Sequence, residues 1–244
     1  MIDTMNETRD KILSHAIPCI AHHGFSRATI VQAAKTANLE LPTALVAFPR
    51  GGVDLGLHFL ERAEKSALIS FSDRPARSKI RDNITIITHT WLDEIFQTPR
   101  IAQKCMALLM TPFYCHETIA LLWKTADDIW CTCGDKSTDY NWYTKRSLLV
   151  AVLLHSIIYG LADKSSDSMK IKIFASDCIQ KCANITQIKN RLQEITIQSN
   201  ILPDTLTSMI ASIIDFILPR IQPPAKLNNI VTNGVRGVAG LSPL

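Results

Sequence analysis

The stretch GFSRATIVQAAKTANLELPTALVAFP, residues 24–49, decides the fold class, because it has the pattern of two short helices joined by a tight turn. Ser26 is placed to cap the first helix, whose apolar residues recur at helical spacing, and Asn38 ends it. Pro42 suits the first turn of the second helix, which extends to Phe48. Another apolar-periodic segment precedes this pair, so the first fifty residues are predicted to form a helix-turn-helix-like unit with a supporting helix.

The second helix of this unit, residues 41–48, is the one that would enter the major groove of DNA. Its sequence, LPTALVAF, holds no Arg, Lys, Asn or Gln, the side chains that most often read base edges. Only Arg27 and Lys35 are nearby for phosphate contacts, and the net charge of the whole chain is only +4. The unit looks like the N-terminal part of TetR-type regulators, yet we expect no binding to nucleic acid. A TetR-like regulator that senses a hydrophobic ligand is the alternative function.

The rest of the chain has helical periodicity and turn signals, without the period-two alternation of strands. A short helix is predicted between Pro99 and Pro112. The fold class is therefore all-α, a TetR-like helical bundle in which residues 1–50 form the helix-turn-helix-like part and residues 51–190 form a C-terminal ligand-binding helical domain. The longer helices of this domain are predicted for residues 54–71, 75–96, 116–130, 139–161 and 169–188.

The sequence after residue 202 divides into two parts. Residues 203–219, PDTLTSMIASIIDFILP, have the spacing of a short amphipathic helix that associates with a membrane, although its polar face lacks Lys and Arg. Residues 220–244 have little to bury and are predicted to form a disordered tail. The residues expected to contact the membrane lie on one face of the helix: Leu206, Met209, Ile210, Ile213, Ile214 and Ile217.

Composition and length narrow the class of protein. Hydrophobic residues make up 47% of the 244 residues, which excludes a chain that is disordered throughout. Seven Cys residues without framework-like spacing indicate reduced thiols. We expect neither a signal peptide nor a membrane span, because the chain lacks a basic N-terminal region followed by an apolar run and lacks a stretch of about 18 apolar residues. The expected location is the bacterial cytoplasm, peripheral to the inner membrane, or the matrix side of a mitochondrion.

Catalytic and metal-binding motifs are missing from the sequence. It has no GxSxG, HExxH, GxGxxG or GxxxxGK pattern. No Glu is followed by His three positions later, as a di-iron carboxylate site in a helical bundle would need. We therefore predict no enzyme activity, no catalytic residue, no bound metal and no cofactor. An enzyme with an unmarked pocket is the third possible function.

The segment 148–161 is apolar nearly all round, so it must be surrounded by protein or by a lipid-like ligand. Trp123 and Trp130 lie seven residues apart and share one face of the preceding helix. These aromatic residues fit a packed core, and they also fit the wall of a pocket for a long hydrocarbon. Six residues at helical spacing are the candidates for lipid contact: Leu108, Leu122, Trp123, Leu149, Leu153 and Ile157.

The block LLWKTADDIWCTCGDKSTDYNWYTKRSLLVAVL, residues 121–153, resembles the Coq-nine family, lipid-binding accessory proteins of ubiquinone (coenzyme Q) biosynthesis. The motifs GD at 134–135, STD at 137–139 and NWYT at 141–144 carry the resemblance, which extends over about residues 8–190. It implies a TetR-like fold without operator binding and a homodimer that holds an isoprenoid or quinone lipid. It also implies docking to demethoxyubiquinone hydroxylase at the membrane surface, where this non-enzymatic chain would present the lipid intermediate.

A partner-binding face is predicted where the two helices of this block meet. Asp139 can cap the second helix, and Trp142 lies in its first turn with Lys145 and Arg146 on the same side. A Trp with charged neighbours is expected at the surface, where Trp, Tyr and Arg dominate binding hot spots. The alternative is an internal stack of Trp on Arg. The predicted partner-binding residues are Asp127, Ile129, Asp139, Trp142 and Tyr143.

Overall fold

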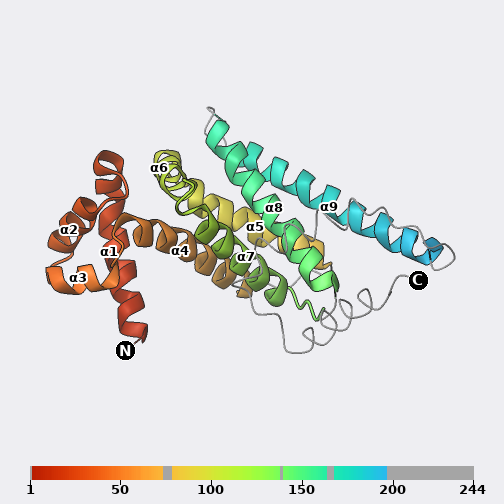
Figure 1. The fold of residues 1–244 in the computed structure, drawn as a ribbon, viewed down its shortest axis with the longest axis horizontal. Coiled ribbons are helices and arrows are strands. Elements are labelled where there is room, and N and C mark those ends of the chain that lie inside the picture. The colour runs from red at the N-terminus through yellow and green to blue at the C-terminus, as the bar shows by residue number, and fades with distance from the viewer. Residues whose placement is uncertain (1, 74–78, 138–139, 164–167, 197–244) are drawn as a thin grey trace, which may run out of the picture.

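The computed structural model describes residues 2–73, 79–137, 140–163 and 168–196, which form helices joined by short turns (Figure 1). No strand occurs within these ranges, so the predicted all-α class is confirmed. The predictions for residues 203–219 and 220–244 lie outside the described residues. In chain order the helices are α1 (Ile2–His23), α2 (Arg27–Thr36), α3 (Leu41–Ala47), α4 (Gly52–Ser72), α5 (Ile80–Phe96), α6 (Pro99–Leu109), α7 (Cys115–Thr132), α8 (Tyr140–Ala162) and α9 (Ser168–Thr196).

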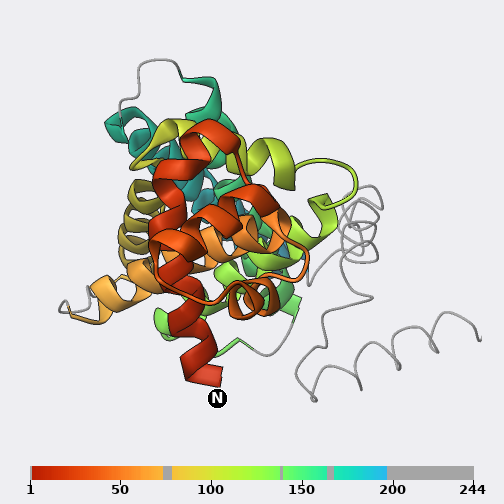
Figure 2. The same ribbon diagram turned by 90° about the vertical axis from the view of Figure 1, so that its left-hand side faces the viewer.

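Helices α1, α2 and α3 form a small unit at one end of the molecule, seen end-on in Figure 2. The side chain of Ser26 accepts a hydrogen bond from a backbone amide in the first turn of α2, as an N-cap does. Asn38, after α2, has a φ of 52°, a left-handed conformation that reverses the chain, and Pro42 lies in the first turn of α3. The exposed Leu41 and Val46 give the surface of α3 an apolar character that suits neither bases nor phosphates.

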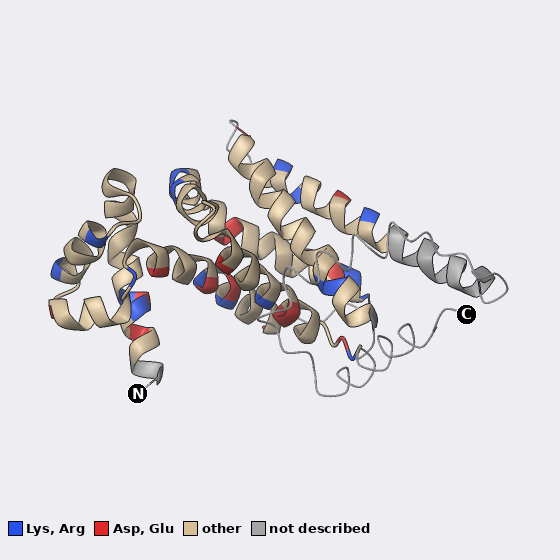
Figure 3. Ribbon diagram, in the orientation of Figure 1, with Lys and Arg blue, Asp and Glu red and all other residues tan. Residues whose placement is uncertain are grey.

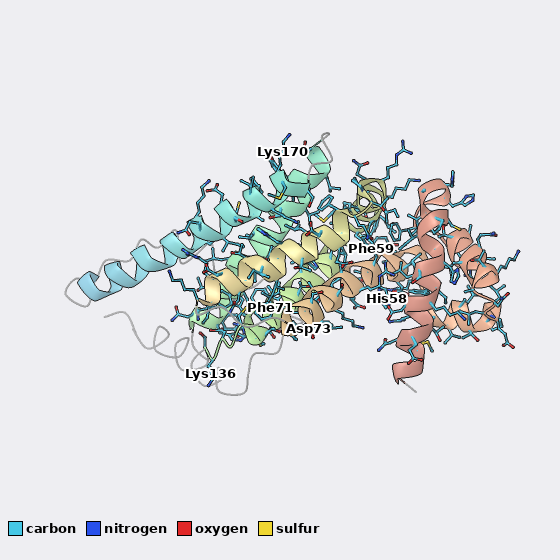
Figure 4. The ribbon with its side chains drawn as sticks, turned by 180° about the vertical axis from the view of Figure 1, so that it is seen from behind. His58, Phe59, Phe71, Asp73, Lys136 and Lys170 are labelled. Atoms are coloured by element: carbon cyan, nitrogen blue, oxygen red, sulfur yellow. The ribbon has the colours of Figure 1, made fainter. Side chains whose placement is uncertain are left out.

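Helix α4 joins this unit to the remaining helices. The ring Nε2 of His58 lies 2.8 Å from Oδ1 of Asp10, which links α4 to α1. Figure 4 shows His58 and Phe59 on the part of α4 near the N-terminal helices, and Phe71 and Asp73 at its far end. One helix therefore extends from the N-terminal unit into the bundle and connects the two parts.

Helices α5 to α9 pack with α4 as a bundle. Helix α5 packs against both α4 and α9, and Trp91 in its middle is buried. Helices α8 and α9 lie side by side in Figure 1, and the rings of Tyr159 and Phe174 stack between them with centroids 4.3 Å apart. Helix α9 continues to Thr196, beyond the end predicted at residue 188.

The Asn141–Ala162 segment of α8 is long and apolar enough to cross a membrane by length and composition, with a mean hydropathy of 1.4. The sequence reading expected no such segment. In this fold α8 packs against α7 and α9, and its residues Leu153 and Ile157 are fully buried. These contacts bury one face of α8, whereas Ile158 on the same helix is 50% exposed.

Candidate lipid-binding pocket

A cavity of about 300 Å³ lies between α5, α7, α8 and α9. Its wall is mainly aliphatic and aromatic, and its volume is at the lower end of the range for small-molecule pockets. Two cationic side chains, those of Arg81 on α5 and Lys145 on α8, also line it. The cavity therefore suits an apolar ligand that carries a polar group at one place.

Three of the four helices present one face to this cavity, with residues three or four positions apart on each. Trp130, near the end of α7, completes the wall. The apolar spacing of each helix thus serves both the core and the cavity. The other apolar wall residues are Ile80 and Ile84 of α5, Leu148, Leu149 and Val152 of α8, and Ile179, Cys182 and Ala183 of α9.

Of the six residues predicted to contact a lipid, Leu149 lies in the cavity wall, and its contact with a lipid stays a prediction. The other five are not among the residues that line this cavity, and their contact with a lipid also stays a prediction. A helix that is apolar all round does not reveal from sequence which face borders empty space. The five residues packed in the core or against it are Leu108, Leu122, Trp123, Leu153 and Ile157.

A buried charge network beside the cavity holds the connection between α7 and α8. Arg146 is only 1% exposed, and it donates from Nε to Asp127 Oδ1 at 2.5 Å and from Nη1 to Asp135 Oδ2 at 3.1 Å. Lys145 donates from Nζ to Asp135 Oδ1 at 2.7 Å, and its carbonyl oxygen accepts from Trp130 Nε1 at 3.2 Å. Because Lys145 and Trp130 both line the cavity, this network sets the positions of two wall residues.

Asp135 is the centre of this network. Its side chain is 4% exposed and receives hydrogen bonds from Lys145, Ser137 and Arg146. Burial by itself would raise the pKa of the carboxyl group, but these donors hold its pKa below the ordinary value of 3.8. The carboxylate therefore stays ionised at neutral pH and balances the buried guanidinium group.

Trp142 does not stand at the surface, so the expectation of an exposed Trp is wrong. It is 8% exposed, with the guanidinium carbon of Arg146 4.2 Å from its ring centroid. Its ring also packs against that of Trp123, with centroids 6.0 Å apart. The internal stack of Trp on Arg, which was the alternative, is what forms. A Trp142→Lys substitution would therefore disturb the fold as well as any binding.

The other predicted partner-binding residues do not make an exposed patch either. Tyr143 and Ile129 are buried, because the start of α8 packs against α7. Asp127 is partly exposed and is bound by Arg146, and Asp139 lies outside the described residues. A role for these residues in partner binding stays a prediction. The expectation that they form an exposed face is wrong, because Ile129, Trp142 and Tyr143 are buried.

A second buried carboxylate, Glu64 of α4, accepts hydrogen bonds from Lys124 Nζ at 2.8 Å and Thr125 Oγ1 at 2.7 Å. Burial raises the pKa of Glu64, and its hydrogen bond with Asp128 raises it further. These contacts tie α4 to α7 away from the cavity wall. Over the described ranges, no group of three or more His, Cys, Asp and Glu side chains is arranged to hold a metal ion.

Known proteins resemble this chain in sequence. Residues 115–186 match the sequence model of the COQ9 family. The chain is 26% identical to the mitochondrial ubiquinone biosynthesis protein COQ9 of Homo sapiens and 28% identical to that of Xenopus tropicalis, each over 177 residues. Each of these alignments covers 68% of this chain and 54% of the relative. The chain thus spans about half the length of the curated relatives it matches.

The fold also has a known counterpart, a TetR transcriptional regulator from Nitrosomonas europaea ATCC 19718. The TM-score is 0.56 at 17% sequence identity, over 72% of this chain and 98% of the regulator. This likeness concerns the fold alone, and it confirms the predicted TetR-like architecture. The segment that matches the COQ9 model contains all of α7 and α8 and much of α9, three of the four helices around the cavity. The resemblance seen in the central block is therefore confirmed, since the chain is similar to the COQ9 ubiquinone biosynthesis proteins over 68% of its length and has a TetR-like fold.

Proposed function

We propose that this chain is an accessory protein of ubiquinone biosynthesis that binds an isoprenoid or quinone lipid in the cavity between α5, α7, α8 and α9. The observation that carries the proposal is that the segment similar to COQ9 supplies three sides of an apolar cavity. The relatives are named as ubiquinone biosynthesis proteins, which supports the same role here. The lipid would be held here and presented to an enzyme that acts on it.

The wall of the cavity suits a hydrocarbon better than a polar substrate. Each Å² of apolar surface removed from water contributes roughly 25 cal/mol, so a prenyl chain is stabilised by entering an aliphatic cavity. A volume of about 300 Å³ gives room for a ring and the first part of its chain, while the remainder of a long chain would extend from the cavity. This arrangement fits a protein that holds one end of a lipid and releases it again.

A carrier role is favoured over catalysis by the chemistry of the described wall. Its ionisable side chains are Arg81, Lys145 and Cys182, which do not include a paired acid and base. Burial raises the pKa of the Cys182 thiol, so this group stays protonated and is a poor nucleophile. The proposal is therefore a non-enzymatic protein that binds and presents a lipid.

Filling the cavity should expel the lipid. Leu148 lines the cavity and is only partly buried, so Leu148→Trp places a larger side chain in the space a ligand would use. We expect native mass spectrometry of the purified wild type to find a prenylated or quinone lipid, and its occupancy to fall at least roughly tenfold in the variant, the equivalent of about 1.4 kcal/mol. Ile158→Trp, on an exposed position of the same helix, is the matched control and should retain the lipid. Equal retention by a folded Leu148→Trp protein would contradict the proposed site.

The same proposal includes a homodimer, a membrane surface and demethoxyubiquinone hydroxylase as partners. If the chain presents a lipid at a membrane, the full chain should sediment with phospholipid vesicles and should retain the hydroxylase in a pull-down. Deleting residues 203–244 should abolish the sedimentation, because the amphipathic segment 203–219 is the proposed contact. Sedimentation that is unchanged by the deletion would remove that contact from the proposal.

A further inference from the structure

The cavity has one basic end within an otherwise apolar wall. Arg81 lies in the first turn of α5 and Lys145 lies near the start of α8, and both side chains line the cavity. Figure 3 shows Lys and Arg gathered on the first turns of α8, at the end of the bundle where Figure 4 places Lys136 and opposite the end that carries Lys170. A cation beside apolar surface is costly unless it has a partner, so the partners of these two side chains matter.

Both side chains are held in position by the protein. Arg81 donates from Nη1 to Oε1 of Gln180 at 2.6 Å and lies 3.5 Å from Asp82 through Nε. Lys145 is bound to Asp135 within the buried network at the end of α7. Arg81 is nevertheless 40% exposed, and its guanidinium group has five N–H donors to distribute. The protein thus holds both cations in position, and the guanidinium group of Arg81 has more N–H donors than these protein contacts use.

A ligand hydroxyl group needs an acceptor for its proton, and the cationic side chains at this end are donors only. Arg and Lys side chains donate hydrogen bonds and accept none. In the described wall no Asp or Glu lines the cavity, and Asp135 nearby already accepts from three donors. The indole N–H of Trp130 is likewise used, by the carbonyl oxygen of Lys145. The described side chains of the wall therefore offer a ligand donors and no carboxylate, and Asp82, which lies beside Arg81, is not among them.

We infer that this basic end is a head-group subsite, formed by Arg81 and Lys145, for lipids whose ring carries hydrogen-bond acceptors only, the oxidised quinone in preference to the quinol. The inference rests on the proposed function and names the chemical form of its ligand. The carbonyl oxygens of a quinone accept directly from both cations. A quinol has two O–H groups, whose protons must turn away from the same cations and find no acceptor among the wall side chains.

The test measures binding of decylubiquinone and of its quinol to the full chain, by calorimetry without oxygen. Wild type should bind the quinone roughly tenfold more tightly, the ratio that a charge-assisted hydrogen bond supplies. Arg81→Met should bring the ratio of the two affinities close to one, while the decyl chain of either compound still binds the cavity. Arg81→Lys should retain most of the preference for the quinone. Arg100→Met, an equivalent change at an exposed position on α6, is the control and should leave the ratio unchanged.

The outcomes separate this inference from the proposed function. Equal affinities of wild type for quinone and quinol, or a ratio in Arg81→Met equal to that of wild type, would overturn the subsite while lipid binding stands. Failure of wild type to bind either compound would overturn both the subsite and the proposed function. Circular dichroism of each variant verifies that a changed ratio comes from a folded protein.

Discussion

Replacing Asp135 with Asn is expected to lower the free energy of unfolding by about 3 kcal/mol. The substitution keeps the size of the side chain and removes its charge, which leaves the 1% exposed Arg146 with Asp127 as its remaining carboxylate. Removing one partner of a buried ion pair is costly because the other charge stays desolvated and is no longer balanced. Urea unfolding followed by circular dichroism at pH 7 measures the change.

A matched control exists on the surface. Asp177 forms an ion pair with Lys181 one turn away on α9, and both side chains are more than half exposed. Asp177→Asn should change the free energy of unfolding by less than about 0.5 kcal/mol, since exposed pairs of this kind contribute little. If the two Asn variants are equally stable, the network at the end of α7 does not support the fold as described.

Wild type and Asp135→Asn should also differ in how their stability depends on pH. The pKa of Asp135 is lowered in the folded chain, so its contribution to stability is fully present above the ordinary value of 3.8 and is lost as the pH falls through the lowered pKa. Wild type should therefore lose part of its stability below about pH 4, and Asp135→Asn should lack that part of the acid transition. The positions of Lys145 and Trp130 in the cavity wall would change in the same pH range.

Gly52→Ala is the second substitution with a large expected effect, again about 3 kcal/mol. Gly52 begins α4, where the chain passes from the N-terminal unit into the bundle. A Cβ atom at this position would lie 2.0 Å from the carbonyl oxygen of Phe25 and 2.9 Å from the amide nitrogen of Ser26. Both are backbone atoms of the connection between α1 and α2, so they cannot move aside as the tip of a side chain can. Thermal or urea unfolding of the purified variant tests the expectation.

Gly56→Ala, one turn further along α4, is the control for this substitution. There the nearest atoms to an added Cβ belong to the Leu109 side chain at 3.4 Å, an ordinary contact distance. In a helix interior Ala is favoured over Gly by about 1 kcal/mol, so this variant should be as stable as wild type or more stable. A Gly52→Ala protein that matches it would show that the N-terminal unit can shift on α4 at little cost.

Local sequence signals predicted the helices and the class of fold. Ser26, Asn38 and Pro42 act within one or two turns of themselves, so the sequence contains the atoms that decide whether a helix begins or ends there. The likeness of the central block to COQ9 proteins was also visible in consecutive residues. It needed no knowledge of how α7 and α8 pack.

Local sequence signals did not predict which face of α8 borders the cavity. Segment 148–161 is apolar on all sides, so Leu149 and Leu153 were equally good candidates for the wall. The structure turns Leu149 toward the cavity and Leu153 into the core. The basic end was missed for a related reason, because Arg81 and Lys145 lie 64 positions apart and line one cavity only when α5 packs beside α8 and α9.

Sequence by itself determined an all-helical chain with a helix-turn-helix-like start and a central block like that of COQ9 proteins. Tertiary structure alone decided which of its charges are buried. Arg146 follows Trp142 by one turn, and from that spacing both could stand in water. Asp127 and Asp135, from α7 and the turn after it, meet the guanidinium group and allow it to be buried over the Trp ring. A charge leaves water only where such partners surround it, and that depends on how distant segments of the chain pack together.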